Sequence, residues 1–379
     1  MQVVSGGFSM TKRILAISNH ASFLGGGEHS FLGLISRLPE DYRAIAAVPC
    51  EGELAKKTSA AGIATEIVPL APLNPLSSAG VIQSTLKFVK ICRNRNIDLI
   101  YANGSRAAFY GGLVGHLCSI PAVWHCRVID SDPYLDAIIT RLCRHIVVNS
   151  RATSLRFSRR LRDKIDIVHN GLDLKWLREE GIAGPEMINA GWISILMVSR
   201  VSRWKRHDVL LEAFERTAGM EKDAHLICVG GKDPSDPDWW DELQKRTALS
   251  PFTERIHWIG HVEDVRPWYR AAAVMVLPSN REPFGRVVVE AMASGLPVIA
   301  TRSGGVPEIV THMRNGILVP ENDPDAVARA LMDLIRNKAL WNLISREAEQ
   351  AANFFGIESH VEKMVRIFRR VSDDQGRDY

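Results

Sequence analysis

The sequence predicts an α/β protein made of two domains, each built around a parallel β-sheet. Short apolar runs alternate with amphipathic patterns of helical period along the chain, which is typical of βαβ units. A polar stretch with glycines and a proline interrupts the alternation at 178–191, and a new apolar run follows it. The 379 residues, 46% of them hydrophobic, are enough for two cores. We therefore predict a first domain over 11–177, a second over 192–355, and a C-terminal helix and tail over 356–379.

The composition predicts a globular, cytoplasmic protein. No apolar run approaches the roughly 20 residues that a membrane-spanning helix needs. The first ten residues lack the basic start and the long apolar core of a signal peptide. The six cysteines form no C-x-x-C pair, which favours reduced thiols. Lysine and arginine outnumber aspartate and glutamate in residues 11–170, although the net charge of the whole chain is only +4, so we expect the first domain to meet an anionic partner.

The first predicted strand, 13–18, leads into a glycine loop. Gly25, Gly26 and Gly27 precede Glu28 and an amphipathic helix that extends to about residue 38. Glycines after the first strand of a parallel sheet let backbone amides approach a phosphate group. The loop is not the complete G-x-G-x-x-G fingerprint, so a plain turn is the alternative.

Further strands, with helices between them, are predicted at 44–48, 65–68, 98–102, 122–126, 146–149 and 165–169. His125 lies near the carboxyl end of one of these runs, where ligands bind in open α/β sheets. A single histidine can also be structural, so both interpretations stay open. Asp130 and Asp132 have the spacing of a metal-binding D-x-D pair. They precede Pro133 and a predicted helix, so we interpret them as a polar loop with a helix N-cap.

The segment from Arg141 to Lys164 is strongly basic. From Ser150, an N-cap candidate, a helix is predicted that would place Leu155, Phe157 and Leu161 among the cations. The segment is either a solvated basic helix or a surface that docks to an anionic membrane. Nucleic-acid binding is not predicted, because no nucleic-acid motif accompanies the charges. The basic side chains are Arg141, Arg144, Arg151, Arg156, Arg159, Arg160, Arg162 and Lys164.

The second half begins with a strand at 193–199, and Arg200 and Lys205 follow it. The next apolar runs, at 225–231 and 256–261, continue the strand pattern, and Val262 follows the second of them. Two cations that follow the domain's first strand can bind an anionic ligand. Surface solvation is the alternative for each of them.

Residues 280–310 are the most informative stretch. Pro283 suits the first turn of a helix, and Gly285 leaves room for a ligand where the helix begins. The free N–H groups at this helix start favour an anion such as a phosphate. Two carboxylates flank the start, Glu282 before the helix and Glu290 inside it. Because carboxylates repel phosphate, we expect them to accept hydrogen bonds from hydroxyl groups, as in a site for a sugar that carries a diphosphate.

This stretch resembles retaining glycosyltransferases of the GT-B fold, and most closely glycosyltransferase family 4 (group 1). Glu282 and Glu290 match the E-x7-E motif of that family, within E-P-F-G, E-A-M-A-S-G-L-P-V-I-A and G-G-V-P-E-I. The family's G-G-x-E loop is matched by Gly26, Gly27 and Glu28, and its N-G-[IV]-D turn by N-G-L-D from Asn170. In its G-R-L-x-x-x-K-G loop, Arg200 and Lys205 are kept, whereas Ser199 and Arg206 replace the two glycines.

The resemblance implies two Rossmann-like domains facing across a cleft, with the last helix, about 357–371, crossing back to the first domain. It implies that Arg200 and Lys205 hold the donor phosphates, that Glu290 binds the ribose and Glu282 the donor sugar, and that His125 supports the reacting carbon. Backbone groups of Gly26, Gly27, Val262, Phe284 and Gly285 would complete the nucleotide-sugar site, and Glu28 would face the acceptor. The implied catalytic residues are therefore His125, Glu282, Arg200 and Lys205.

The implied reaction is transfer of a sugar from a nucleotide-diphosphate sugar (UDP- or GDP-sugar) to an acceptor hydroxyl with retention, and with no metal or cofactor. The acceptor would be a glycan, a lipid-linked molecule or a small molecule, within bacterial cell-envelope polysaccharide, lipopolysaccharide or glycolipid synthesis. The enzyme would be cytoplasmic, at the inner face of the plasma membrane if the segment from Arg141 to Lys164 docks there. Two alternatives stay open: another enzyme of this fold, such as a sugar phosphorylase or a nucleotide-sugar epimerase, and a non-enzymatic module that binds a glycan or a membrane surface.

Overall fold

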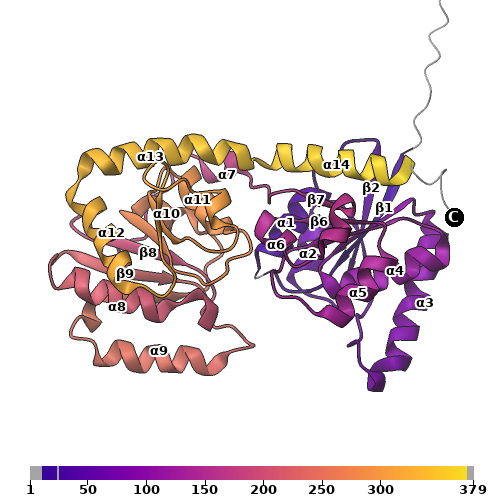
Figure 1. Cartoon of the computed structure of the whole chain (residues 1–379), viewed down its shortest axis with the longest axis horizontal. Coiled ribbons are helices and arrows are strands. Elements are labelled where there is room, and N and C mark those ends of the chain that lie inside the picture. The colour runs from indigo at the N-terminus through magenta and orange to yellow at the C-terminus, as the bar shows by residue number, and fades with distance from the viewer. Residues whose placement is uncertain (1–10, 24, 374–379) are drawn as a thin grey trace, which may run out of the picture. The chain divides into compact units, whose positions relative to one another are not determined.

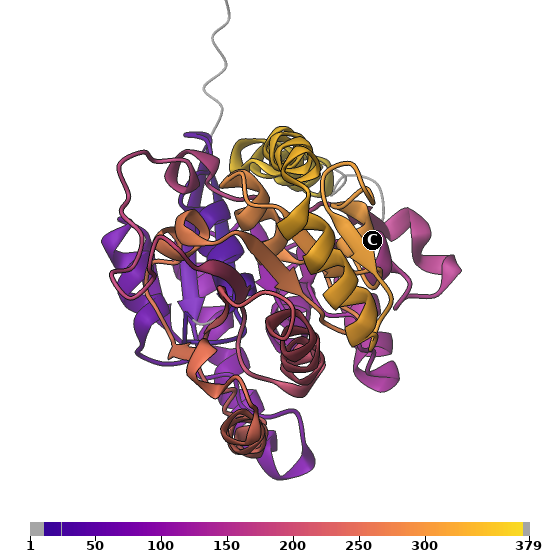
Figure 2. The ribbon, with the colours of Figure 1, turned by 90° about the vertical axis from the view of Figure 1, so that its left-hand side faces the viewer.

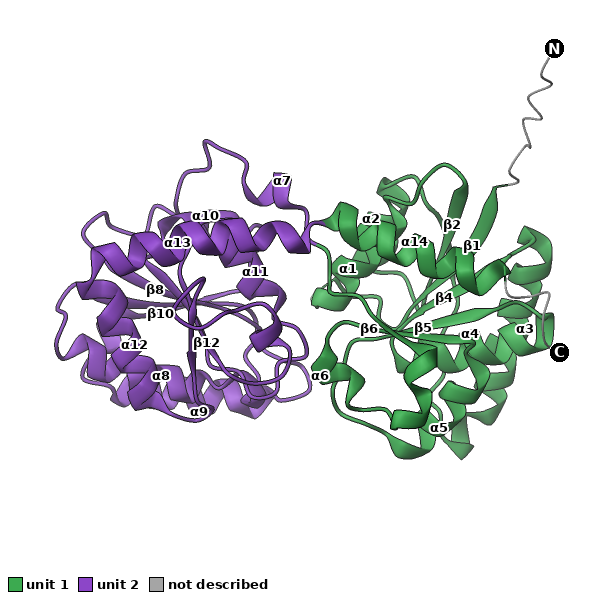
Figure 3. Ribbon diagram, turned by 45° about the horizontal axis from the view of Figure 1, so that its top comes forward, with its two compact units in different colours: residues 1–171, 357–379 green, residues 172–356 purple. Residues whose placement is uncertain are grey.

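The computed structural model describes residues 11–23 and 25–373 of the chain. It divides into two compact units: unit 1 extends to Gly171 and takes up the chain again from Ile357, and unit 2 comprises Leu172–Gly356 (Figure 3). Each unit contains one sheet in which the strand pairs are all parallel. The predicted α/β fold with two parallel-sheet domains is therefore confirmed, whereas the cleft between them stays a prediction.

Unit 1 holds a seven-stranded sheet in the order β3-β2-β1-β4-β5-β6-β7. The chain leaves β1 toward one edge and then returns to β4 on its other side, so the strand order reverses between β1 and β4. The strands are β1 (Lys12–Ser18), β2 (Tyr42–Val48), β3 (Ala64–Ile67), β4 (Leu99–Asn103), β5 (Ala122–Cys126), β6 (His145–Val148) and β7 (Ile165–Ile167). The helices are α1 (Gly26–Ile35), α2 (Glu53–Ala60), α3 (Ser78–Arg95), α4 (Ser105–Cys118), α5 (Pro133–Leu142), α6 (Arg151–Ser154) and α14 (Ile357–Asp373), with 3-10 turns η1 (Pro75–Ser77) and η2 (Arg159–Lys164).

Unit 2 holds a six-stranded sheet in the order β10-β9-β8-β11-β12-β13, which reverses between β8 and β11. Helices lie on either side of this sheet (Figure 2). The strands are β8 (Ile193–Val198), β9 (Ala224–Val229), β10 (Ile256–Gly260), β11 (Val274–Leu277), β12 (Val298–Thr301) and β13 (Ile317–Val319). The helices are α7 (Leu174–Leu177), α8 (His207–Ala218), α9 (Pro237–Leu249), α10 (Arg266–Ala271), α11 (Arg286–Ala293), α12 (Pro324–Arg336) and α13 (Lys338–Ala352), with 3-10 turns η3 (Arg203–Lys205), η4 (Thr253–Arg255), η5 (Val306–Glu308) and η6 (Asn353–Phe355).

The strands are apolar on both faces because each sheet has a core on either side. In β8, Leu196 and Val198 join one buried cluster, whereas Ile195 and Met197 join the cluster on the opposite face. This alternation follows from the two-residue period of a strand. Such a sheet produces continuous apolar runs in the sequence, and these runs are what located the strands.

The C-terminal helix α14 belongs to unit 1, as predicted (Figure 1, yellow). Val361, Met364 and Phe368 of this helix join the buried cluster that contains Ile14 and Phe31. The helix is also tied by a hydrogen bond of 2.7 Å between His360 Nδ1 and the carbonyl oxygen of His169. The last helix of the chain therefore completes the core of the first domain.

The helix predicted from Ser150 is wrong beyond its first turn. The Ser150 hydroxyl does accept a hydrogen bond of 3.0 Å from the Thr153 amide, but α6 ends at Ser154. Leu155 then points to solvent, and the chain turns so that Arg156 and Phe157 reach the interior. Phe157 packs edge-on against the Trp124 ring, at 5.2 Å between centroids, and Arg156 forms a two-pronged ion pair with Asp136, at 2.8 and 2.5 Å.

Candidate functional site

Most of the residues that the sequence singled out lie after the strands at which each sheet reverses; His125, within β5, and Val262, after β10, are the exceptions. In open α/β sheets this point, at the carboxyl ends of the strands, is where ligands bind. In unit 2 the loops that follow β8 and β11 carry Arg200, Lys205 and Glu282, and Glu290 lies on α11. In unit 1, Gly26, Gly27 and Glu28 form the first turn of α1, the helix that follows β1, and His125 lies near the end of β5. Each unit therefore has its own group of candidate residues.

Lys205 and Glu282 form an ion pair between the two loops of unit 2. The Lys205 Nζ lies 2.7 Å from the Glu282 Oε2, and the two side chains are only 12% and 9% exposed. The Lys205 ammonium also lies 4.0 Å from the centroid of the Trp204 ring, within the range of a cation–π interaction. The structure thus brings together two predicted catalytic residues that are 77 positions apart in the sequence.

A glycine turn holds the backbone of Glu282. The Gly305 amide donates a hydrogen bond of 2.8 Å to the Glu282 carbonyl oxygen. Gly304 has φ of 60°, and a Cβ atom built at this position would lie 2.0 Å from the same oxygen. No side chain fits at Gly304, so the turn of Gly304 and Gly305, which begins the G-G-V-P-E-I match, positions the loop of Glu282.

Arg206 adopts the backbone conformation that glycine would supply. Its φ is 58° and its ψ is 47°, at the position where the resembled G-R-L-x-x-x-K-G loop has its last glycine. The left-handed conformation costs a residue with a side chain about 1–2 kcal/mol. The Arg206 guanidinium offsets part of this cost with two bonds to Asp208, at 3.0 and 2.7 Å, and a third to Asn322. The loop therefore keeps its course without the glycine.

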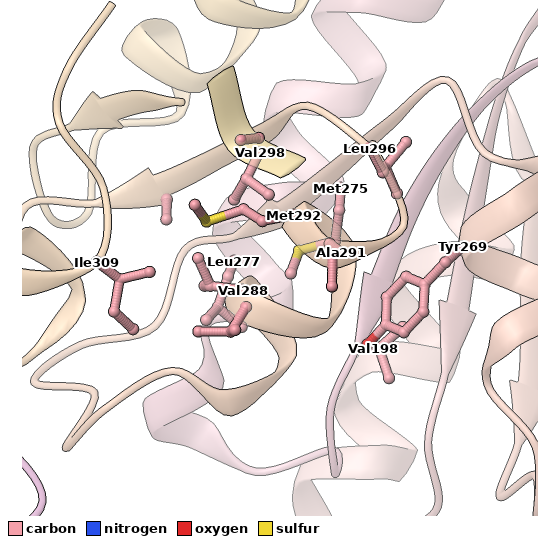
Figure 4. Close-up of a cluster of buried hydrophobic side chains, with 14 of the residues drawn as sticks. Val198, Tyr269, Met275, Leu277, Val288, Ala291, Met292, Leu296, Val298 and Ile309 are labelled. Atoms are coloured by element: carbon pink, nitrogen blue, oxygen red, sulfur yellow. The ribbon is translucent and has the colours of Figure 1, made fainter. Parts of the chain in front are cut away.

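Glu290 is held by two protein donors inside unit 2. Its Oε2 accepts a hydrogen bond of 3.0 Å from the Tyr269 hydroxyl, and its Oε1 accepts one of 2.7 Å from the Arg286 Nε. Figure 4 shows Tyr269 beside the buried residues of α11. Burial raises the pKa of Tyr269 well above its usual value, and the neighbouring Glu290 charge raises it further, so the hydroxyl stays protonated and donates. Sequence reasoning missed both donors; Arg286, four residues before Glu290 on a helix, was the readable signal.

The other residues predicted for the donor site of unit 2 are either more exposed than Lys205 and Glu282 or can offer only backbone groups. Arg200 is 43% exposed and lies 3.7 Å from Asp233, whose carboxylate is almost buried. The Phe284 ring is buried against Phe355, so it can offer a ligand only backbone groups. Gly285 has φ of 97° and begins α11, and Val262 is partly buried against the core beneath it.

Glu28 is a nearly buried carboxylate in the glycine loop of unit 1. It lies in the first turn of α1 and is 7% exposed. A Cβ atom on Gly25 would lie 2.5 Å from its Oε2, so the glycine makes room for the carboxylate. Within residues 11–23 and 25–373, no side chain or backbone group forms a hydrogen bond or ion pair with the Glu28 carboxylate. Its oxygens are therefore available to a hydroxyl donor.

His125 is completely buried and neutral. Its Nδ1 lies 2.9 Å from the Tyr101 hydroxyl and 3.2 Å from the Arg127 guanidinium. Burial and the positive charge of Arg127 lower the pKa of His125 well below its usual value. Because arginine only donates, Nδ1 must accept, and the ring proton belongs on Nε2, which has no partner among the described residues. The predicted contact between His125 and a donor sugar stays a prediction.

Arg127 organises a polar cluster that the sequence did not reveal. Its Nε donates to Asn103 Oδ1 at 2.7 Å, a second nitrogen donates to Asn170, and the third contacts the Tyr101 hydroxyl at 3.4 Å and His125. These partners come from β4, from β5 and from Asn170, the first residue of the N-G-L-D turn. These residues are distant in the sequence and meet only because they lie toward the carboxyl ends of the strands. No local sequence pattern indicates that they form a cluster.

The D-x-D pair serves as a helix cap, as predicted. The Asp132 carboxylate accepts a hydrogen bond of 3.0 Å from the Leu135 amide at the start of α5. Among the residues that the structure describes, no group of three or more His, Cys, Asp or Glu side chains is arranged to hold a metal ion. That the reaction needs no metal stays a prediction.

The basic segment divides into buried and exposed cations. Arg156 is paired with Asp136 inside unit 1, and the Lys164 ammonium donates a hydrogen bond of 2.5 Å to the Thr140 carbonyl oxygen. Leu155, between these residues, is 84% exposed. The exposed cations are Arg141, Arg151, Arg159, Arg160 and Arg162. Among the described residues, no helix is long and apolar enough to cross a membrane.

Comparison with known families identifies both halves of the chain. Residues 24–176 match the model of "Glycosyltransferase Family 4", and residues 193–337 match that of "Glycosyl transferases group 1". The first match falls on the parallel-sheet unit 1 and the second on unit 2.

Individual proteins resemble this chain less completely. A D-inositol 3-phosphate glycosyltransferase of Streptomyces avermitilis is 33% identical over 205 residues, which cover 52% of this chain and 44% of that protein. An N-acetyl-alpha-D-glucosaminyl L-malate synthase of Bacillus anthracis is 25% identical over 311 residues, or 76% and 78% of the two chains. The chain spans about half the length of several curated relatives that it matches.

Solved structures share the fold. The crystal structure of Anabaena HepE in complex with UDP and glucose superposes with a TM-score of 0.82 at 22% identity, covering 94% of this chain and 99% of that one. The two parallel-sheet units therefore have the GT-B fold.

Proposed function

We propose that this chain, which belongs to the group 1 and family 4 glycosyltransferases, transfers a sugar from a nucleoside diphosphate to an acceptor hydroxyl with retention at the anomeric carbon. The observation that carries the proposal is the Lys205–Glu282 pair, a nearly buried cation and carboxylate 2.7 Å apart where the sheet of unit 2 reverses. A diphosphate needs a cation, and a sugar hydroxyl needs an acceptor of hydrogen bonds. This pair offers both at one place.

The other residues of unit 2 take complementary roles in the proposal. Arg200, which is half exposed, shares the diphosphate with Lys205. Glu290, whose orientation Tyr269 and Arg286 fix, accepts hydrogen bonds from the ribose hydroxyls. Backbone groups near Phe284 and Gly285 complete the anion site at the start of α11, and Val262 contributes a backbone contact to the base.

The reaction is a substitution on one face of the sugar. The acceptor oxygen forms a bond to the anomeric carbon while the bond from that carbon to the β-phosphate oxygen breaks. The acceptor's proton passes to the leaving phosphate, so charge and atoms balance without an enzyme nucleophile. Arg200 and Lys205 stabilise the negative charge that grows on the phosphate, which is usually a large contribution to catalysis.

Uridine diphosphate is the first donor nucleotide to test. The similar Anabaena structure was determined with UDP and glucose, which supports UDP without assigning it to this chain. Thermal unfolding with UDP, GDP, ADP and TDP, without added metal, should show a rise in the midpoint for one nucleotide, because a ligand that binds only the folded state stabilises it. The Glu290→Ala variant should lose that rise. A well-folded protein whose midpoint responds to none of the four nucleotides would favour the non-enzymatic binding module.

Product analysis separates the enzymatic alternatives. A sugar phosphorylase would consume inorganic phosphate, and a nucleotide-sugar epimerase would convert the donor without any acceptor. The proposed transferase instead releases free nucleoside diphosphate in proportion to the glycoside formed. A role in cell-envelope glycan synthesis depends on the identity of the acceptor. Product analysis with candidate acceptors would identify it.

We further propose that the exposed cations between Arg141 and Lys164 contact an anionic membrane surface. Leu155, which is 84% exposed, lies within the same segment and offers an apolar contact. Sedimentation with vesicles of phosphatidylglycerol and phosphatidylcholine should show binding that weakens with salt and in the Leu155→Asp variant. Equal binding to vesicles of phosphatidylcholine alone would contradict an electrostatic contact.

A further inference from the structure

We propose that Arg127 binds an anionic group of the acceptor, so that the acceptor is a hydroxyl compound that carries a phosphate or a carboxylate. This inference rests on the proposed function and names the substrate class of its acceptor side. It stands on the charge of Arg127, on its place beside the glycine loop, and on the neighbouring carboxylate of Glu28.

The charge of Arg127 has no counter-ion among the residues that the structure describes. Its guanidinium is half-buried, and its four partners, Asn103, Asn170, Tyr101 and His125, are all uncharged. Within the same residues no carboxylate lies within 4.0 Å of it. Burying a charge is costly unless an opposite charge compensates it. A ligand anion would supply that compensation.

Arg156 shows what a structural arginine looks like in the same unit. Its side chain is 2% exposed and forms a two-pronged ion pair with Asp136. The fold therefore provides a carboxylate where it needs an arginine for packing, and surrounds Arg127 with neutral acceptors. These acceptors fix the direction of the guanidinium and leave its charge in place.

Arg127 lies beside the glycine loop. A Cβ atom on Gly27 would lie 3.7 Å from the Arg127 Cδ, and the Gly27 carbonyl oxygen accepts a hydrogen bond of 3.3 Å from Asn103. The ten-residue helix α1 begins at Gly26, so its positive end adds to the charge of Arg127. The His125 Nε2, buried and without a partner among the described residues, belongs to the same cluster.

The carboxylate next to this loop requires that the anion also carry a hydroxyl group. Glu28 follows Gly27 directly, and its oxygens have no partner in the described part of the chain. A carboxylate repels an anion but accepts a hydrogen bond from a hydroxyl. Arg127 and Glu28 together therefore select a small polyol or hydroxy acid with an acidic group, and orient its hydroxyl for transfer.

The test uses the full chain and inorganic phosphate as the probe. Saturating UDP first occupies the diphosphate site of unit 2, and phosphate is then titrated against chloride at constant ionic strength while the unfolding midpoint is recorded. Phosphate should raise the midpoint of the wild type. Arg127→Gln should weaken the apparent phosphate affinity by about tenfold or more, because it removes a charge-assisted hydrogen bond. Arg127→Lys, which keeps the charge, should retain part of the effect.

The matched control is Arg95→Gln. Arg95 forms an ion pair with Glu66 on the edge strand β3, whereas Arg127 follows β5, so the loss of Arg95 should leave the phosphate response unchanged. The proposal is overturned if phosphate has no effect on the UDP-loaded wild type, or if Arg127→Gln and Arg95→Gln respond alike. A loss of the UDP response in Arg127→Gln with an intact phosphate response would assign Arg127 to the donor instead. Failure of UDP itself to bind the wild type would contradict the proposed function, whatever phosphate does.

Discussion

Lys205 and Glu282 hold opposite charges 2.7 Å apart in a place where water has little access to either. Removing one member of such a pair leaves the other charge buried and unpaired, whereas a neutral isostere keeps the hydrogen bond. The choice of substitution therefore separates the contribution of each residue to stability from its contribution to turnover.

Glu282→Gln should lower turnover about 10²- to 10³-fold and cost less stability than Lys205→Met, because the amide oxygen still accepts a hydrogen bond from Lys205 but neither balances its charge nor holds a sugar hydroxyl as firmly. Lys205→Met should lose turnover and also about 3 kcal/mol or more of stability, since it leaves the Glu282 carboxylate without its cation. Steady-state rates and chemical denaturation measure the two effects. Wild-type-like rates in both variants would remove this site assignment.

Tyr269→Phe should weaken nucleotide binding, although in the proposed site Tyr269 does not touch the nucleotide and acts only through Glu290. The variant removes the hydrogen bond of 3.0 Å that orients Glu290, and a bond to a charged group contributes about 1.5–3 kcal/mol. Tyr110→Phe is the matched control, because it removes a hydrogen bond of 3.0 Å to the Ala71 carbonyl oxygen in unit 1. Calorimetric titration with the nucleotide that stabilises the wild type should show a lower affinity in the first variant only. An equal affinity in both variants would show that Arg286 alone positions Glu290.

The sequence singles out candidate residues where a motif carries them, and it does not single out residues that only the fold brings together. Glu282, Glu290 and Lys205 belong to patterns of glycines, prolines and charges that are readable within a few positions. Tyr269 and Arg127 have no such pattern, because their partners lie on other strands and helices. Burial is the second limit: the sequence placed His125 near a strand end but could not show that it has no exposed surface.

At the scale of elements, the site depends on loops that pass very close to one another. Gly304→Ala should destabilise unit 2 and abolish nucleotide binding, because a Cβ atom would lie 2.0 Å from the Glu282 carbonyl oxygen and force the loop to move. Gly62→Ala is the matched control, since Gly62 has a similar φ of 74° with no atom within 4 Å of its Cβ position. It should cost only about 1 kcal/mol, because the left-handed conformation is then the sole penalty. Thermal unfolding and nucleotide titration test both, and equal losses would show that backbone strain, and not the close approach, matters at Gly304.

The elements themselves followed the periodicity of the sequence, with one instructive exception. Strands buried on both faces give short continuous apolar runs, which an amphipathic helix does not produce, so the predicted strands match those of the sheets. The segment after Ser150 reads as a helix because its leucines, phenylalanine and arginines alternate suitably. Its actual course is set by two contacts with other elements: Phe157 packs on Trp124 of β5, and Arg156 pairs with Asp136 of α5. In this segment the tertiary contacts outweighed the helical pattern of the local sequence.

At the scale of the whole molecule, the sequence predicted two parallel-sheet domains and a last helix that returns to the first, and these are properties of connectivity. Histidines that stay neutral in the folded protein are a property that connectivity does not reveal. His125 and His207 are buried, and His225 is partly buried. Burial lowers the pKa of His207 to about 3 and that of His225 to about 4, with help from the charge of Lys205 and from His257, respectively. Burial lowers the pKa of His125 well below its usual value as well. All three must take up a proton on unfolding in mildly acidic solution.

Stability should therefore fall as the pH drops below about 6.5, the ordinary pKa of histidine in the unfolded chain. Between that pH and a folded pKa of about 3 or 4, the unfolded state binds more protons than the folded state, so the free energy of unfolding decreases with decreasing pH. Of the nine tryptophans only Trp124 lies in unit 1, so tryptophan fluorescence during urea denaturation reports mainly on unit 2, which contains His207 and His225. His225→Gln should flatten the dependence of the unfolding free energy on pH between about 6.5 and 4, because one proton fewer is taken up, while the dependence on urea concentration stays the same. The same slope in the wild type and in His225→Gln would mean that His225 is already protonated in the folded protein, and that its stacking on Trp192, at 3.6 Å between ring centroids, does not exclude the charged form.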